Sequence, residues 1–213
     1  MPAILNYVIA VIIAYLLGSI PVGIFVVRIL SGRDIREVGS GRTGGTNAFR
    51  AAGLTAGILT AFGDIAKGFA AVYIGRLLGG GEPALEAVCG VAAVAGHNWP
   101  IFLNFKGGAG TGPNVGAAVA LWPWSAVVLI PLAALTLYTT GYASVASTAA
   151  GVFIVGIFVA RAIVLNTPVA YIGYAIGTLI LTGLALIPNY KRLVAGTERR
   201  VGPRSKSATP KPE

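Results

Sequence analysis

Three long stretches of the chain contain no charged side chain: residues 1–27, 107–160 and 162–190. A helix of about 20 apolar residues is long enough to cross the hydrocarbon core of a bilayer. Only 11% of the residues are charged and 55% are hydrophobic, whereas a soluble domain has about 25% charged residues. This pattern predicts an integral membrane protein, and it excludes a disordered chain, a collagen-like repeat and an ordinary water-soluble enzyme.

The apolar blocks predict an all-α, polytopic membrane helix bundle with about seven transmembrane helices, and five crossings remain the alternative. The block 107–160 is divided at Trp122-Pro123-Trp124, a sequence typical of a membrane interface, and again at residues 139–142. Residues 1–198 are predicted to form a single integral-membrane domain, followed by a basic, disordered tail over 199–213. The expected spans cover residues 4–29, 53–78, 84–101, 111–123, 124–140, 144–163 and 168–187.

The basic residues predict the orientation of the bundle. No Lys or Arg precedes Arg28, so the first apolar block does not resemble a cleaved signal peptide. The positive-inside rule places the N-terminus outside and the C-terminus in the cytoplasm. No basic patch is interleaved with exposed aromatic residues, so we expect no nucleic-acid partner. The residues assigned to the cytoplasmic side are Arg28, Arg33, Arg36, Arg42, Arg50, Lys106, Lys191, Arg192, Arg199, Arg200, Arg204, Lys206 and Lys211.

A glycine-rich loop follows the first span and runs from Gly39 to Arg50. Its glycines allow backbone N–H groups to approach a ligand, its hydroxyl groups can donate hydrogen bonds, and Arg50 can bind a phosphate with two N–H groups. The loop is either an anion-binding cradle or a flexible turn whose arginines serve topology alone. Its glycine spacing also matches a dinucleotide-binding pattern, but no strand precedes it, so we reject that interpretation.

Three further polar segments interrupt the apolar sequence. Asp64 and Lys67 are three residues apart in a predicted span, where they either neutralise each other or lend positive charge to a site. His97, the single histidine, precedes a second glycine run that contains Lys106. A basic segment from Asn189 to Glu198 follows the last span. The two glycine-rich loops and this basic segment are predicted to face one compartment. There they would form a phosphate pocket with an apolar approach from the bilayer.

These segments resemble motifs of the bacterial acyl-phosphate-dependent glycerol-3-phosphate acyltransferases of the PlsY type. The resemblance covers about residues 18–198, nearly the whole chain. It rests on four ordered motifs and on Asp64, Lys67 and Gly68 in the second span. The motifs are Gly18-Ser19-Ile20-Pro21; Gly39-Ser40-Gly41 with Gly44, Thr46, Asn47 and Arg50; Gly96-His97 with Pro100, Phe102, Phe105-Lys106-Gly107-Gly108 and Gly110; and Asn189 with Arg192-Leu193 and Gly196-Thr197-Glu198.

The resemblance implies that the chain transfers an acyl group from acyl phosphate to the 1-hydroxyl of sn-glycerol 3-phosphate, releasing lysophosphatidic acid and phosphate, the first step of phospholipid synthesis. It also implies a multi-pass protein of the bacterial inner membrane, among membrane lipids, with its active site on the cytoplasmic face. Because acyl phosphate is already activated, we expect no metal and no cofactor. We predict direct transfer, without an acyl-enzyme.

The motifs also imply roles for particular residues. The catalytic candidates are Ser40, Arg50, Lys106 and His97, with Arg50 and Lys106 pairing a phosphate and stabilising the tetrahedral centre. The substrate-binding candidates are Gly39, Gly41, Thr46, Asn47, Gly107, Gly108, Asn189, Arg192 and Glu198.

The chain departs from the usual family pattern at two positions. The family usually has Asn where this chain has Arg42, and Lys where it has Ala109. If both loops line one pocket, Arg42 restores the charge lost at 109. The alternative function is a divergent, non-catalytic or transport protein that binds a phosphorylated lipid or metabolite.

Overall fold

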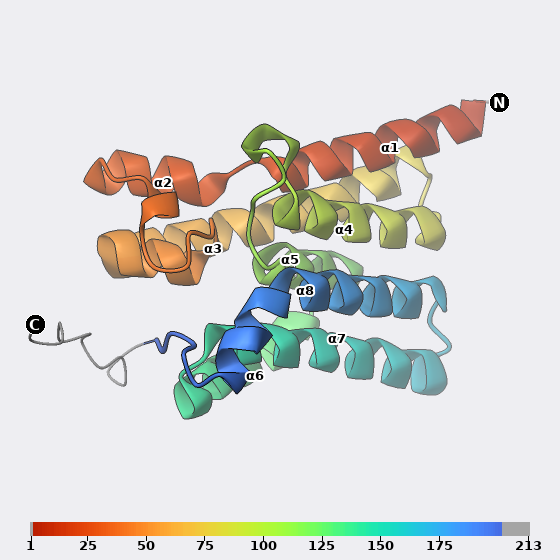
Figure 1. Cartoon of the computed structure of the whole chain (residues 1–213). Helices are drawn as coiled ribbons and strands as arrows, with labels where there is room; N and C mark the ends of the chain where they lie inside the picture. Colours follow the sequence, from red (N-terminus) through yellow and green to blue (C-terminus); the bar gives the residue numbers. More distant parts are fainter. Residues whose placement is uncertain (1, 202–213) are drawn as a thin grey trace, which may run out of the picture.

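The computed structural model describes residues 2–201, with side chains from residue 4 onward. Within this range the chain is all-helical, and its helices run along one common direction (Figure 1). The all-α prediction is confirmed. Most of the predicted tail, residues 202–213, lies outside the described range. The α-helices are α1 (Pro2–Ser19), α2 (Val22–Ser31), α3 (Gly45–Leu78), α4 (Pro83–Asn98), α5 (Thr111–Leu121), α6 (Ser125–Thr140), α7 (Ala143–Leu165) and α8 (Ala170–Val194), with 3₁₀ turns at Ile35–Glu37 and Ile101–Leu103.

The first two predicted spans contain breaks. The span predicted over 4–29 is divided into α1 and α2 at Ile20 and Pro21, because proline has no N–H for the helix ladder. Helix α3 begins before the predicted residue 53, but Ala52 and Gly53 are not helical and Gly53 has a φ of +82°. The segment 45–51 therefore folds back on the long arm, and Gly45 packs against Gly57 and Ala61.

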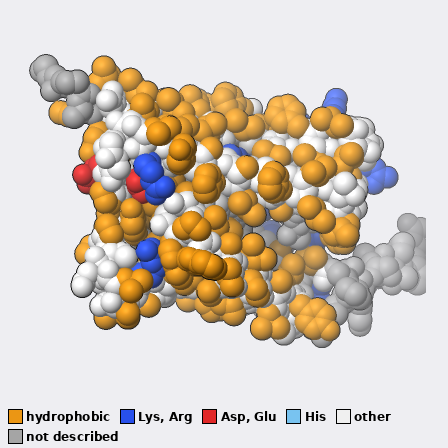
Figure 2. All heavy atoms as spheres, turned by 180° about the vertical axis from the view of Figure 1, so that it is seen from behind, with side chains coloured by type: hydrophobic (Ala, Val, Ile, Leu, Met, Phe, Trp, Pro, Cys, Tyr) orange, Lys and Arg blue, Asp and Glu red, His pale blue; other side chains and the backbone are white. Residues whose placement is uncertain are grey.

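Four helical segments of the described chain are long and apolar enough to cross a membrane: 4–31, 45–78, 143–165 and 170–194. Helix α6 is apolar but shorter. Helices α4 and α5 are also short, because the loop between them turns back beside the junction of α1 and α2 (Figure 1). Hydrophobic side chains cover most of the lateral surface in Figure 2, and the charged ones lie mainly toward its two ends. The chain is a polytopic membrane helix bundle, while the number of crossings and the orientation stay predictions.

In two helix pairs, each helix places a glycine against a backbone carbonyl oxygen of the other. A Cβ on Gly18 of α1 would overlap the carbonyl oxygen of Ala93 in α4, and a Cβ on Gly96 of α4 would overlap that of Tyr15 in α1. Gly68 of α3 and Gly116 of α5 approach the carbonyl oxygens of Pro113 and Ile65 in the same reciprocal way. Close backbone approach through small residues stabilises helix association in membranes, where burial of apolar surface provides little drive.

Replacing Gly116 with Ala should therefore destabilise the bundle. The added methyl group overlaps a backbone oxygen of α3 that no side-chain rotation can move, and overpacking of this kind costs about 1–3 kcal/mol. Thermal unfolding of the purified protein in detergent measures the effect. Gly183→Ala is the matched control, since nothing lies within 4 Å of the Cβ that it adds. Equal melting temperatures for the two variants would contradict the packing argument.

Candidate active site

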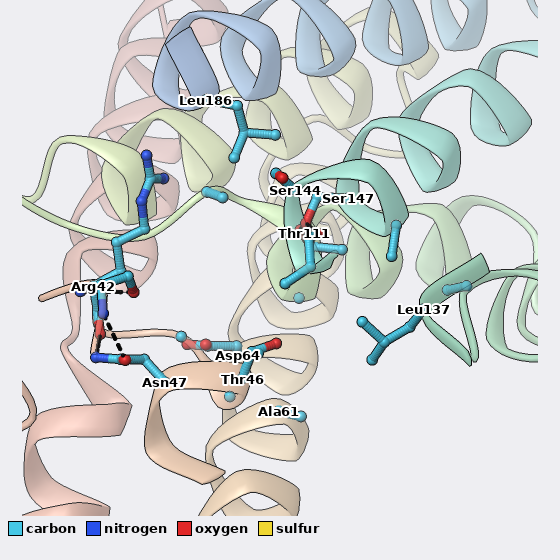
Figure 3. A pocket seen from close by; sticks show the side chains of 18 of the residues that line it. Arg42, Thr46, Asn47, Ala61, Asp64, Thr111, Leu137, Ser144, Ser147 and Leu186 are labelled. Atoms are coloured by element: carbon cyan, nitrogen blue, oxygen red, sulfur yellow. Dashed lines mark hydrogen bonds between the residues drawn. The ribbon is translucent and has the colours of Figure 1, made fainter. Parts of the chain in front are cut away.

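A cavity of about 350 Å³ lies between the two glycine-rich loops and helices α3, α5, α6, α7 and α8. One side is polar: Arg42, Thr46, Asn47 and Asp64 lie together there in Figure 3, with Leu137 on the opposite side. The opposite wall is one apolar face of α6, formed by Ile130, Ala133, Ala134 and Leu137. The spacing of these residues places them on a single side of the helix. The cavity is thus amphipathic, with a polar end and an apolar wall.

Asn47 holds the first loop in shape. Its side chain is 2% exposed, and its Oδ1 accepts a hydrogen bond from the N–H of Ser40 at 3.1 Å. Its Nδ2 lies 2.9 Å from the carbonyl oxygens of Ile35, Val38 and Arg42. Because buried polar groups need partners, this amide organises the turn that places Ser40 and Arg50 at the cavity. Its own polar atoms are already engaged within the loop.

Arg42 joins both loops to α8. Its guanidinium donates to the carbonyl oxygen of Gly108 at 3.1 Å, to the carbonyl oxygen of Ala185, and to Oδ1 of Asn189 at 2.8 Å. All three acceptors are uncharged. Burial lowers the pKa of Arg42, and the nearby Arg192 lowers it further while Glu198 raises it. Since an arginine remains protonated in proteins, Arg42 brings to the cavity a positive charge that no carboxylate in the described part of the chain pairs.

The remaining ionic groups leave an excess of positive charge. Glu198 accepts from Arg192 Nε at 2.8 Å and from Asn189 Nδ2 at 2.7 Å. Arg50 lines the cavity, and no acceptor in the described part of the chain binds its guanidinium. The charged side chains that line the cavity are Arg42, Arg50, Arg192, Arg199, Asp64 and Glu198. The arrangement suits an anionic ligand. A phosphate fits well, because a guanidinium can bind two phosphate oxygens at once.

Asp64 and Lys67 form the buried ion pair that their spacing predicts. Lys67 Nζ lies 2.9 Å from Asp64 Oδ1, and the side chains are 6% and 3% exposed. Asp64 lines the cavity, whereas Lys67 lies behind it. The pair is neutral as a unit, which lowers the cost of placing both charges in a membrane helix. Of the two interpretations of these residues, neutralisation is the one that the geometry supports.

Comparison with known proteins identifies the family to which this chain belongs. The family model described as glycerol-3-phosphate acyltransferase matches residues 8–196. Glycerol-3-phosphate acyltransferase 2 of Moorella thermoacetica is 36% identical over 203 residues, which cover 93% of this chain and all of that protein. The glycerol-3-phosphate acyltransferase of Rubrobacter xylanophilus is 39% identical over 203 residues, covering 93% and 96% of the two chains. The chain belongs to the glycerol-3-phosphate acyltransferase family.

Solved structures extend the likeness to the fold. The crystal structure of PlsY in its glycerol 3-phosphate form has a TM-score of 0.82 and 34% identity, covering 92% of this chain and 96% of that one. The lysophosphatidic acid form of PlsY has a TM-score of 0.80 and 32% identity, with coverages of 93% and 97%. These are integral membrane acyltransferases, so the predicted resemblance is confirmed and the chain is a multi-pass membrane enzyme of the acyltransferase class.

The structure of this acyltransferase brings together many, but not all, of the residues singled out from the sequence. Lys106 is exposed and does not line the cavity. Gly39 and Gly41 shape the turn with φ of +56° and +70°. The N–H groups of Gly107 and Gly108 are bonded to the carbonyl oxygens of Asn98 and His97, so neither N–H points to a ligand. The predicted residues that line the cavity are Ser40, Thr46, Asn47, Arg50, His97, Asn189, Arg192 and Glu198.

Other lining residues of the acyltransferase cavity were not predicted. The sequence marks Arg42 only as a departure from the family pattern, although its position inside a glycine-rich loop is itself a signal. Arg199 falls in the predicted tail, yet it lines the cavity. The apolar wall of α6 carries no polar signal in the sequence, and only the packing of the bundle shows which of its faces is turned inward.

Proposed function

We propose that this protein transfers an acyl group from an acyl phosphate to the 1-hydroxyl of sn-glycerol 3-phosphate, at the cytoplasmic face of the bacterial inner membrane. The observation that carries the proposal is the amphipathic cavity, because each of its two halves fits one half of an acyl phosphate. The arginine-rich end suits the phosphate groups of both substrates. The apolar face of α6 suits the acyl chain. The solved PlsY forms, named for glycerol 3-phosphate and lysophosphatidic acid, support the same substrate and product.

The reaction needs no covalent intermediate on the enzyme. The 1-hydroxyl oxygen of glycerol 3-phosphate attacks the carbonyl carbon of acyl phosphate, and a new ester C–O bond forms. The bond between that carbon and the bridging phosphate oxygen breaks, and inorganic phosphate leaves. The proton of the hydroxyl group passes to a phosphate oxygen of the substrates. The protein's contribution is to hold two anions together and to stabilise the charge that develops on the carbonyl oxygen.

The positions of the side chains assign the work within this reaction. Arg50 lines the cavity, no acceptor among the described residues binds its guanidinium, and it binds a phosphate while stabilising the tetrahedral centre. Ser40 and Thr46, on the same wall, donate hydroxyl hydrogen bonds to a phosphate. Asn189 and Arg192, both bonded to Glu198, close the pocket from α8. Lys106 remains a candidate for pairing a phosphate, but it has to enter the cavity from its exposed position to do so.

The chemistry of the substrates provides the decisive test. The full chain is purified in detergent, supplied with palmitoyl phosphate and glycerol 3-phosphate, and assayed for both phosphate and lysophosphatidic acid. We expect equal amounts of the two products, and no product from palmitoyl coenzyme A, which serves as the control donor. Substrate binding without turnover would instead support the alternative of a non-catalytic or transport protein.

A further inference from the structure

The Lys67 ammonium group lies among three polar atoms from separate parts of the chain. Asp64 Oδ1, the carbonyl oxygen of Ile20 and His97 Nδ1 all lie 2.9 Å from Nζ. The Ile20 acceptor is available because α1 and α2 are separated at Ile20 and Pro21. An ammonium group has donors and no lone pair, so Lys67 donates to the Ile20 carbonyl oxygen and to His97 Nδ1, and it pairs with the Asp64 carboxylate by charge.

This arrangement fixes the proton on the imidazole. Because Lys67 donates to His97 Nδ1, that nitrogen presents its lone pair and the ring proton lies on Nε2. The opposite tautomer would direct Nδ1–H at a lysine N–H. Asp64 Oδ1 is 3.5 Å from His97 Nδ1, farther than the lysine nitrogen, so the carboxylate does not take over this contact. A neutral imidazole thus carries one donor, on the side away from Lys67.

The free side of the ring lies at the cavity and beside the second loop. His97 is 4% exposed and lines the cavity. A Cβ on Gly108 would overlap His97 Nε2, so only a residue without a side chain fits beside that nitrogen. The Gly108 N–H is bonded to the His97 carbonyl oxygen at 2.9 Å, which holds the loop in place over the ring.

We propose that Lys67 is a positioning residue that fixes His97 as an N–H donor from Nε2 to an oxygen of the bound phosphate substrate, and that His97 does not act as a general base. The proposal rests on the acyltransferase function proposed above and assigns one donor of that site. It also explains a buried charge that does not reach the substrate. A base at this position would need an unprotonated Nε2, which the contact from Lys67 prevents.

The tautomer can be measured without any turnover, because His97 is the only histidine of the chain. Histidine-labelled ¹⁵N protein in detergent at pH 7 gives one pair of ring nitrogen resonances. We expect a protonated Nε2 and an unprotonated Nδ1. In Lys67→Met we expect the proton to move to Nδ1, facing Asp64. A protonated Nδ1 in the unmodified protein would overturn the proposal, whatever the enzyme's activity.

Substitutions of His97 distinguish a hydrogen-bond donor from a general base. His97→Gln keeps an N–H donor and an acceptor for Lys67, whereas His97→Ala keeps neither. We expect His97→Ala to lower kcat about 100-fold, the effect of removing one donor to developing charge, and His97→Gln to recover at least about tenfold of that loss. Equal activity of the two variants would show that the site does not use a donor here.

A double variant separates the positioning role of Lys67 from a general loss of stability. Lys67→Met leaves Asp64 buried without a partner, which destabilises a protein strongly, while the double variant Asp64→Asn, Lys67→Met removes both charges. We expect the double variant to remain folded, to lose the Nδ1 contact from Lys67, and to show a lower kcat with KM for glycerol 3-phosphate changed less than about threefold. A double variant with unchanged kcat would overturn the positioning role.

Discussion

Replacing Arg50 with alanine is expected to lower kcat about 10³-fold, at the upper end of the effect of removing one donor to developing negative charge. Arg50 lines the cavity with its guanidinium unclaimed by protein acceptors in the described chain. Its bonds are therefore made to substrate, and their loss is not compensated by a neighbouring group. The rate of lysophosphatidic acid formation at saturating substrate, measured on purified protein in detergent, gives the effect.

Two further variants test the interpretation of this loss. Arg50→Lys keeps the charge but not the two-pronged geometry, so it should recover only part of the activity. Lys106→Ala is the comparison from the second loop. Since Lys106 is exposed outside the cavity, we expect its loss to cost less than about tenfold, well short of the effect at a transition-state donor. A Lys106 variant as impaired as Arg50→Ala would show that the second loop moves Lys106 into the site during the reaction.

Replacing Arg42 with asparagine is expected to lower kcat/KM about 100-fold, the scale of one charged, hydrogen-bonded donor. Arg42 connects the second loop, α8 and Asn189, and it adds to the cavity a positive charge that no carboxylate of residues 4–201 pairs. Asparagine supplies neither the charge nor the reach of the arginine. Steady-state assays with varied glycerol 3-phosphate and varied acyl phosphate show which substrate depends on this guanidinium.

Position 109 offers a way to restore the activity that Arg42→Asn loses. Arg42 donates to the carbonyl oxygen of Gly108, and Ala109, the next residue, lines the same cavity. If the cavity needs a cation here and either loop can supply it, then Arg42→Asn combined with Ala109→Lys should be at least about tenfold more active than Arg42→Asn alone. Neighbouring groups that share a function give such non-additive effects. Additive losses in the double variant would refute compensation.

The bundle could be predicted because a membrane restricts the fold. The charge-free blocks fix where helices lie, since a backbone in lipid has to satisfy its own hydrogen bonds. The break at Pro21 and the fold-back at Gly53 were not predicted, because a single proline or glycine in apolar sequence is also found within intact membrane helices. At the first break, Lys67 of α3 donates to the Ile20 carbonyl oxygen, a contact that the sequence does not reveal.

The site was predicted in its outline but not in its detail. Charge and glycine content identified the loops, and eight of the predicted residues do line the cavity. The same content does not distinguish a ligand-binding group from a group that shapes the loop, which is why Asn47 was counted among the substrate contacts although its amide is bonded to the backbone. The second loop shows the same limit, since its glycine N–H groups are used internally.

The way Asn47 holds the first loop has a consequence for which side chains position 42 can carry. At position 42 the amide of Asn47 binds only the main-chain oxygen, a group that every amino acid supplies. A substitution at position 42 therefore changes what the loop offers to the substrate while leaving the course of its backbone intact. The loop is thus a scaffold whose charge at position 42 can be changed without redesigning the turn.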